Sequence, residues 1–480
     1  ACLGTVYIGR AVDGSGAINV GSQGTVDLSG ESFDLTIQGT SSNLLFNSAG
    51  AAALSLVSGG ILTIDIGTGT VTSPGGATTD VSIAGTGILD IASGAIGASG
   101  TPLIATVGTL RVDAAGDIFI SETNGVQLGD GTGGITGSGG IEITVNGTIT
   151  TGNTVSSTGG GGSAIDISNT AGNITVTYAV TAAGSDTIAV DSAALFTLAN
   201  GIVVSSGTGA VSVTSVGTLT VNGDITTGGA MTITSSAGVT MDTGSLIRGG
   251  TTVDVTSGNA GIVFDVIEST GSDVITVAAS GGGGGPITEA DNTARLGAAG
   301  SNSILVLSGT TLGASGNGAL NTDVATLRLT ATGAAYINET SGIALGDGIG
   351  TVTSSGGLLW LNAAGAVTTG NTISTTGGGA SHITIISTGS TIDLNNPVTT
   401  AEGGTVTITN NGLLTITAAA PITAYGGFVQ NGAGAVSTAG NITTSGDTVN
   451  FLRAVTLTGD ITIDTTDGGG SAAGNAVTFQ

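Results

Sequence analysis

The chain has 480 residues and a formal net charge of −26 at pH 7, with 32 acidic residues against six basic ones. This shortage of cations excludes a protein that binds nucleic acid or an anionic membrane surface, because both partners are held by clustered basic side chains. The 90 glycines would suit a flexible linker, but hydrophobic residues make up 39% of the chain and are spread along it, which excludes a disordered linker.

The chain contains one cysteine, close to the start of the sequence. Cys2 is the single cysteine, so we expect no internal disulfide and no cysteine-rich metal site. Ala1 precedes it, which disfavours a lipid anchor.

No apolar run of about 18 residues occurs, so no transmembrane helix is expected. Without an initiating Met or a signal peptide, the chain is expected to be a processed form or a segment of a longer protein.

Short alternating segments predict strands along the whole chain. Val, Ile and Leu alternate with Thr and Ser, as in residues 142–145, 173–176 and 405–409. Period-2 alternation of β-branched residues is the pattern of a strand with one buried face. No segment has the spacing and capping residues of a long helix. The sequence therefore predicts an all-β protein.

A long internal repeat relates residues 87–228 to residues 303–445. The matching segments lie 216 to 218 positions apart and include the rare Arg, Glu and Asp residues, which compositional bias cannot explain. The clearest pairs are Thr109-Leu110-Arg111-Val112 with Thr326-Leu327-Arg328-Leu329, Ile120-Ser121-Glu122-Thr123 with Ile337-Asn338-Glu339-Thr340, and Gly223-Asp224-Ile225-Thr226 with Gly440-Asn441-Ile442-Thr443. About 140 residues were therefore duplicated.

A shorter period lies inside the long repeat. Strand centres recur every 6 to 9 residues, and three such steps make a turn of about 21 residues. This is the period of a three-faced β-solenoid with Gly, Asn or Asp at its corners. We therefore predict one continuous solenoid over residues 1–480, an elongated rod of about 23 coils and on the order of 110 Å at ~4.8 Å per coil.

Two turns carry candidate metal ligands. Asp130 and Asp347 lie in Gly-Asp-Gly turns at matching places of the two copies. Asp oxygens at a turn can hold Ca²⁺, but the calcium-binding nonapeptide of β-solenoids does not occur here. A corner-turn role is the main expectation for both residues, calcium is the alternative, and no other cofactor is expected.

Residues 281–294 are expected to form a loop that leaves the solenoid. Five glycines, Gly281 to Gly285, precede Pro286. A phosphate-binding loop would require a following Lys and helix, and neither occurs.

Trp360 and His382 each occur once in the chain and are candidate site residues. Trp360 has apolar neighbours and is predicted to fill the core, with a sugar-binding platform as the alternative. His382, the single histidine, lies in an alternating segment and is predicted to face outward from a strand. Acid–base catalysis on a β-helix needs paired carboxylates or a base in a cleft, and no such set is visible. We predict no catalytic or cofactor-binding residue and no enzymatic activity.

The sequence resembles the filamentous-haemagglutinin-like, β-strand-repeat type of giant bacterial surface proteins. The resemblance rests on the Gly-Asp/Asn-Ile-Thr turns, the Gly-Ala-Ser-Gly and Thr-Leu-Arg elements and residues 455–464. It implies a right-handed parallel β-helix that is exported and displayed outside the cell. Asn396-Pro397 does not match the secretion-domain motif of the two-partner-secreted members, which leaves the route of export open.

These features together predict an extracellular or cell-surface structural protein that forms a fibre, filament, sheath or coat. Residues 476–480 read as a strand without a capping element, so solenoids are expected to continue or to stack end to end through self-association. The alternative is an adhesin on a β-helical stalk that binds glycans or neighbouring cells through loops such as residues 281–294.

Overall fold

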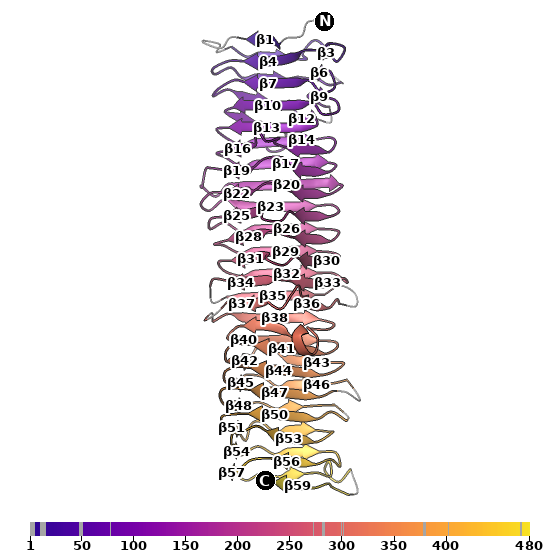
Figure 1. Cartoon of the computed structure of the whole chain (residues 1–480). Coiled ribbons are helices and arrows are strands. Elements are labelled where there is room, and N and C mark those ends of the chain that lie inside the picture. The colour runs from indigo at the N-terminus through magenta and orange to yellow at the C-terminus, as the bar shows by residue number, and fades with distance from the viewer. Residues whose placement is uncertain are drawn as a thin grey trace. The chain divides into compact units, whose positions relative to one another are not determined.

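Short strands stack in parallel and form a β-solenoid, as Figure 1 shows for each part of the chain. Along these strands, buried aliphatic residues alternate with outward polar residues. The computed structural model describes residues 5–9, 16–47, 51–76, 78–271, 273–280, 284–298, 300, 302–377, 381–401, 403–470 and 473–480. It contains two compact units, Ala1–Ser235 and Ser236–Gln480. The predicted fold class, an all-β parallel solenoid, is confirmed.

Most turns of the first unit consist of one longer and two shorter strands. The first longer strands are β1 (Thr5–Gly9), β4 (Asp34–Gln38), β7 (Ile61–Asp65), β10 (Ile88–Ser93) and β13 (Thr109–Ala114). The shorter strands beside them are β2 (Ile18–Val20), β5 (Leu44–Phe46), β8 (Thr70–Thr72) and β11 (Ala95–Ile96) on one face, and β3 (Val26–Leu28), β6 (Leu54–Leu56), β9 (Val81–Ile83) and β12 (Leu103–Thr106) on the other.

The rest of the first unit has its longer strands on a different face. These are β14 (Ile118–Glu122), β17 (Ile141–Asn146), β20 (Ala164–Ala171), β23 (Thr187–Ser192), β26 (Val211–Ser215) and β29 (Met231–Ser235). The shorter strands are β15 (Val126–Leu128), β18 (Ile149–Thr151), β21 (Ile174–Val176), β24 (Phe196–Leu198) and β27 (Leu219–Val221), and β16 (Ile135–Gly137), β19 (Val155–Ser157), β22 (Val180–Ala182), β25 (Val203–Ser206) and β28 (Asp224–Thr227).

The second unit begins in the same way. Its first longer strands are β32 (Val253–Ser257), β35 (Val274–Ala279), β38 (Ile304–Gly309) and β40 (Thr326–Ala331). The shorter strands are β30 (Gly238–Met241), β33 (Gly261–Phe264) and β36 (Ile287–Glu289), and β31 (Leu246–Gly249), β34 (Val266–Ser269), β37 (Arg295–Gly297) and β39 (Leu320–Asp323), with the 3₁₀-helix η1 (Gly316–Gly318) before β39.

The remaining strands of the second unit again have the longer strands on another face. These are β41 (Ala335–Glu339), β44 (Leu359–Ala363), β47 (Ile383–Ser387), β50 (Val406–Asn410), β53 (Phe428–Asn431), β56 (Val449–Phe451) and β59 (Val477–Phe479). The others are β42 (Ile343–Leu345), β45 (Val367–Thr369), β48 (Ile392–Leu394), β51 (Leu414–Ile416), β54 (Val436–Thr438) and β57 (Val455–Leu457), and β43 (Val352–Ser354), β46 (Ile373–Thr375), β49 (Val398–Thr399), β52 (Ile422–Ala424), β55 (Ile442–Thr444) and β58 (Ile463–Asp464).

Each unit contains a turn at which the long and short strands exchange faces, and we call this the face switch. In the first unit the long strand β13 pairs with both short strands β15 and β16, while the two short strands β11 and β12 pair with the long strand β14. In the second unit β40 pairs with both β42 and β43, while β39 and the bridge residue Leu312 pair with β41. The two face switches occupy matching places in the duplicated segments.

The turn length is about 23 residues, slightly more than the 21 expected. Ile118 pairs with Ile141 after a turn of this ordinary length, whereas the turn that leads from Ile275 to its partner Leu305 is distinctly longer. Turns can differ in length because extra residues are accommodated at the corners, where they leave the strand pairing unchanged. Within the segment expected to be a loop, 281–294, residues 287–289 form β36, and residues 281–283 lie outside the described residues.

The core consists of stacked aliphatic layers. In β47 the side chains of Ile383 and Ile385 are fully buried, and Thr384 between them faces outward. Ile385 pairs in register with Leu361 of the preceding turn and Ile408 of the next, so that like side chains pack on like. Burial of each such side chain contributes about 1.5–3 kcal/mol.

Buried hydroxyl and amide groups bind the corner backbone. Ser192 Oγ donates to Leu195 O at 2.8 Å, and Ser387 Oγ donates to Gly365 O at 2.7 Å. Asn410 Nδ2 donates to Gly412 O at 2.7 Å. These inward polar residues supply donors to corner carbonyl groups, since a buried carbonyl group without a partner would cost about 1–3 kcal/mol.

Removal of one core side chain should destabilise the stack. We expect Ile408→Ala, at a fully buried position, to lower the free energy of unfolding by about 2–5 kcal/mol because it opens a cavity between turns. The neighbouring Thr407→Ala, on the outward side of the same strand, should cost less than about 1 kcal/mol. Urea unfolding followed by circular dichroism measures both, and equal losses would contradict the layered core.

Candidate functional site

An arginine–aspartate pair lies at each face switch. Arg111 lies in β13 between the residues that pair with β15 and those that pair with β16, and Asp130 lies in the turn that joins these two strands. Arg111 Nε donates to Asp130 Oδ1 at 2.8 Å, and its other end reaches Asp90 at 3.3 Å. The guanidinium therefore holds the turn between β15 and β16 in place, at the point where the single strand β13 pairs with two shorter strands.

The second copy repeats the arginine–aspartate pair, with Val306 in the place of Asp90. Arg328 lies between the residues of β40 that pair with β42 and β43, and its Nε donates to Asp347 Oδ1 at 3.0 Å. The arginine lowers the pKa of both aspartates, that of Asp347 to about 2. Both turns need glycine: Gly129 and Gly346 have φ of 75° and 78°, and a Cβ at either would come within 2.6 Å of the facing asparagine.

The structure therefore brings Asp130 and Asp347 to arginine, and calcium would have to displace the guanidinium groups. Each aspartate also accepts hydrogen bonds from the backbone of its own turn, as the corner-turn interpretation expects. Among the residues that the structure describes, no three His, Cys, Asp or Glu side chains are grouped to hold a metal ion. The calcium alternative finds no support in this geometry.

A buried glutamate accompanies each face switch. Glu122 accepts a hydrogen bond from Val107 N at 3.0 Å, and burial raises its pKa to about 8. Its other oxygen is buried without a partner in the described part of the chain. In the second copy, Glu339 accepts bonds from Thr322 Oγ1 at 2.8 Å and from Ser341 N at 2.9 Å, and burial raises its pKa as well.

A third charged cluster lies on β31, β34 and β37. Glu268, 4% exposed, accepts a hydrogen bond from Arg248 Nε at 2.6 Å and forms a second ion pair with Arg295. Arg248 pairs in register with Glu268, and Arg295 lies at the start of β37 on the following turn. The buried carboxylate therefore joins an arginine on the turn before it to an arginine on the turn after it.

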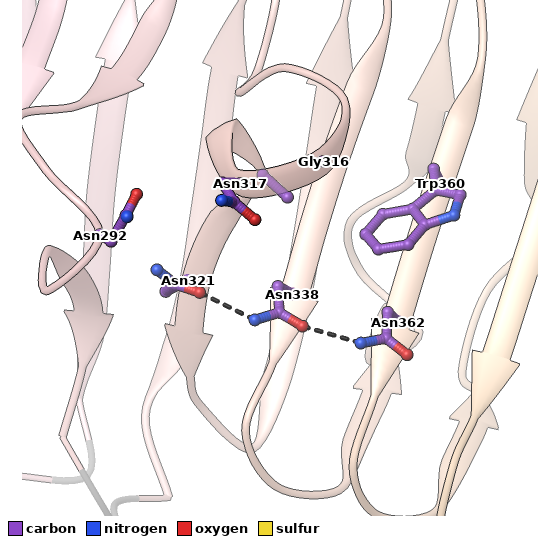
Figure 2. A pocket seen from close by; sticks show the side chains of 8 residues that line it. Asn292, Gly316, Asn317, Asn321, Asn338, Trp360 and Asn362 are labelled. Atoms are coloured by element: carbon purple, nitrogen blue, oxygen red, sulfur yellow. Dashed lines mark hydrogen bonds between the residues drawn. The ribbon is translucent and has the colours of Figure 1, made fainter.

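Trp360 is the principal correction to the sequence analysis. It does not fill the core: Leu359 and Leu361 face inward, and Trp360 between them faces outward on β44. There it lines a hollow of about 500 Å³ together with Asn321, Asn338 and Asn362. Figure 2 shows the indole beside these amides, with η1 on the opposite side. We call this space the Trp360 hollow.

His382 directly precedes β47 and faces outward, as predicted from the alternation. Its Nδ1 accepts a hydrogen bond from Thr405 N at 3.1 Å and lies 2.8 Å from Thr405 Oγ1. This places it in contact with the next turn. Cys2 lies outside the described residues. No helix in the described part of the chain is long and apolar enough to cross a membrane.

The two Arg–Asp pairs were not predicted from the sequence, although the sequence contains a signal for them. Arg111 and Asp130 have the same separation in sequence as Arg328 and Asp347, 19 positions in each case. A recurring separation close to one turn places two side chains on neighbouring turns. In a chain with only six Lys and Arg residues, its recurrence was informative.

Stability should fall as the pH rises, owing to Glu122. The native state keeps this proton up to about pH 8, whereas the unfolded chain releases it near 4.5, so unfolding becomes easier between these values. We expect Glu122→Gln to remove on the order of 4 kcal/mol of this pH dependence. Urea midpoints at pH 5 and 8.5 measure it, with exposed Glu31→Gln as the control. An unchanged pH dependence in Glu122→Gln would contradict the assignment.

The Arg–Asp pairs, and no bound calcium, should hold the Gly-Asp-Gly turns. We expect a chelator such as EGTA to leave the melting temperature unchanged. Arg328→Met should cost about 1–3 kcal/mol because it leaves Asp347, whose side chain is 20% exposed, without its charged partner. Arg453→Met is the control, since that guanidinium is exposed and donates to its neighbour Leu452 O. A calcium-dependent rise in melting temperature that Asp347→Asn abolishes would contradict this.

Comparison with protein-family models, with curated proteins and with solved structures finds no match for this chain.

Proposed function

We propose that the chain is a structural protein of a cell surface, exported from the cell and built into a fibre, filament, sheath or coat. The observation that carries the proposal is the layered core. Turn after turn, the same inward aliphatic positions stack in register, and each turn contacts its neighbours through the same three strand positions. A fold of this kind lengthens by adding turns, which suits a load-bearing or covering element.

The outward surface suits exposure to solvent. Outward strand positions carry mainly Thr, Ser, Asn and Asp, as in Thr144, Ser168 and Asp191, which lie in register on three turns. The net charge of −26 makes molecules repel one another. This repulsion keeps soluble a surface that consists mainly of uncharged polar groups. Self-association through sheet edges is part of the proposal, because unpaired strand edges recruit further strands.

Four of the five arginines in the described part of the chain have carboxylate partners. Arg111, Arg248, Arg295 and Arg328 each form an ion pair with a carboxylate on a neighbouring turn. The buried glutamates lie at the face switches, where strands divide. The proposal accordingly assigns these charges to maintaining the solenoid and assigns no catalytic role to them.

Immunogold electron microscopy of intact source cells tests the location and the assembly together. We expect antibodies against this chain to label fibres or a coat outside intact cells, without permeabilisation. An antibody against a cytoplasmic protein is the control and should label permeabilised cells only. Labelling of this chain that requires permeabilisation, or surface label without any fibre or coat, would overturn the proposal.

A further inference from the structure

The Trp360 hollow is built from uncharged polar groups and one large aromatic ring. It lies on the outward faces of β39, β41 and β44, and η1 and Asn292 border it (Figure 2). Its volume is about 500 Å³, within the range of pockets that hold small ligands. The described residues that line it are asparagine, glycine, alanine and tryptophan, and none of them carries a charge.

Three asparagines form a row of hydrogen-bonded amides along successive turns. Asn338 Nδ2 donates to Asn321 Oδ1 at 2.8 Å, and Asn362 Nδ2 donates to Asn338 Oδ1 at 2.8 Å. The row is anchored at its first member, since Asn321 donates through both its backbone N and its Nδ2 to Glu289. All three side chains are therefore held in one orientation before a ligand arrives.

The row leaves hydrogen-bonding capacity open to the hollow. Each amide has two N–H donors, and the contacts within the row use one donor of Asn338 and one of Asn362. In the described part of the chain Asn362 Oδ1 accepts no hydrogen bond. Donors and acceptors thus stand side by side, an arrangement that suits hydroxyl groups, which both donate and accept.

The aromatic ring lies next to this row. Trp360 is two residues before Asn362 on β44, so its side chain emerges on the same face, about 7 Å along the strand. Tyr336 pairs in register with Trp360 on the preceding turn, as Asn338 does with Asn362. Two parallel rows result, one aromatic and one of amides.

The other copy of the duplication lacks both rows. By strand register, Ile104, Ser121 and Thr144 occupy the places of Asn321, Asn338 and Asn362. Glu142 occupies the place of Trp360. One of the single-residue insertions that distinguish the two copies falls at η1, beside the hollow, where Gly100-Thr101-Pro102 corresponds to Gly316-Asn317-Gly318-Ala319. The backbone that the two copies share therefore does not require these residues.

We propose that the Trp360 hollow binds a neutral glycan. The indole stacks on the apolar face of one sugar ring, and the amides of Asn338 and Asn362 bond its hydroxyl groups. Rigid aromatic rings and Asn amides are the pairing that supplies contact area together with adaptable hydrogen bonds. Acidic sugars are excluded because the lining offers no cation and the chain carries a net charge of −26. Binding requires one chain only, so it is independent of filament assembly.

The single tryptophan of the chain is a built-in reporter of this site. Purified protein is titrated with neutral hexasaccharides of glucose, mannose, galactose and N-acetylglucosamine in different linkages, and with hexagalacturonate as the acidic comparison. We expect saturable change of Trp360 emission with at least one neutral sugar and none with hexagalacturonate. Absence of saturable binding by every neutral sugar up to millimolar concentration, or preference for the acidic one, overturns the proposal.

Variants then test where the glycan binds. Their affinity is measured by calorimetry, because some of them replace Trp360, the fluorescent reporter. Trp360→Ala and Asn338→Ala should each weaken binding at least tenfold, and Trp360→Phe should retain a measurable part of it. Glu142→Ala and Ser121→Ala, at the matching places of the other copy, should leave it unchanged. Circular dichroism melting verifies the fold of each variant. Unchanged glycan affinity in folded Trp360→Ala overturns the assignment. If Trp360→Ala does not fold, unchanged affinity in Asn338→Ala overturns it.

Discussion

Register between turns is the constraint on which the rest of the molecule depends. An inward aliphatic side chain is useful only where the turn before and the turn after present another at the same place, as Leu361, Ile385 and Ile408 do. Corners are exempt from this constraint. The turn from Val211 to its partner Met231 is much shorter than the turn from Ile275 to Leu305, yet both pairs lie in continuous ladders of longer strands. Differences in turn length are therefore accommodated between the strands.

The face switches show how a solenoid changes its cross-section without losing register. One long strand supports two short ones, and the residue at the division is an arginine in both copies, Arg111 and Arg328. Where two short strands replace one long strand in the stack, a turn takes the place of the middle of the long strand. The ion pair from arginine to Asp130 or Asp347 fixes that turn. The buried Glu122 and Glu339 close the inner side of the same region. The charges that duplication preserved are therefore those that geometry requires.

The sequence was sufficient to predict the strands, the duplication and the parallel solenoid, because all three follow from the period-2 pattern and from repeated residues. The turn length was underestimated, since corner residues leave no periodic signal. Trp360 was misassigned because its neighbours are apolar, although strict alternation through Leu359 and Leu361 already placed it on the opposite side. The amide row could not be predicted: the steps from Asn321 to Asn338 and from Asn338 to Asn362 are unequal, and only the strand register shows that the three side chains meet.

The amide row also shows how a solenoid acquires new recognition sites. Asn362 is followed in register by Ile386 on the next turn and by Thr409 on the turn after that, both on the same outer face. The backbone already holds these positions one strand spacing apart, so a single codon change from isoleucine to asparagine would add a further polar group in line with the others. A surface of this kind evolves in whole steps of one turn, without any rearrangement of the fold beneath it.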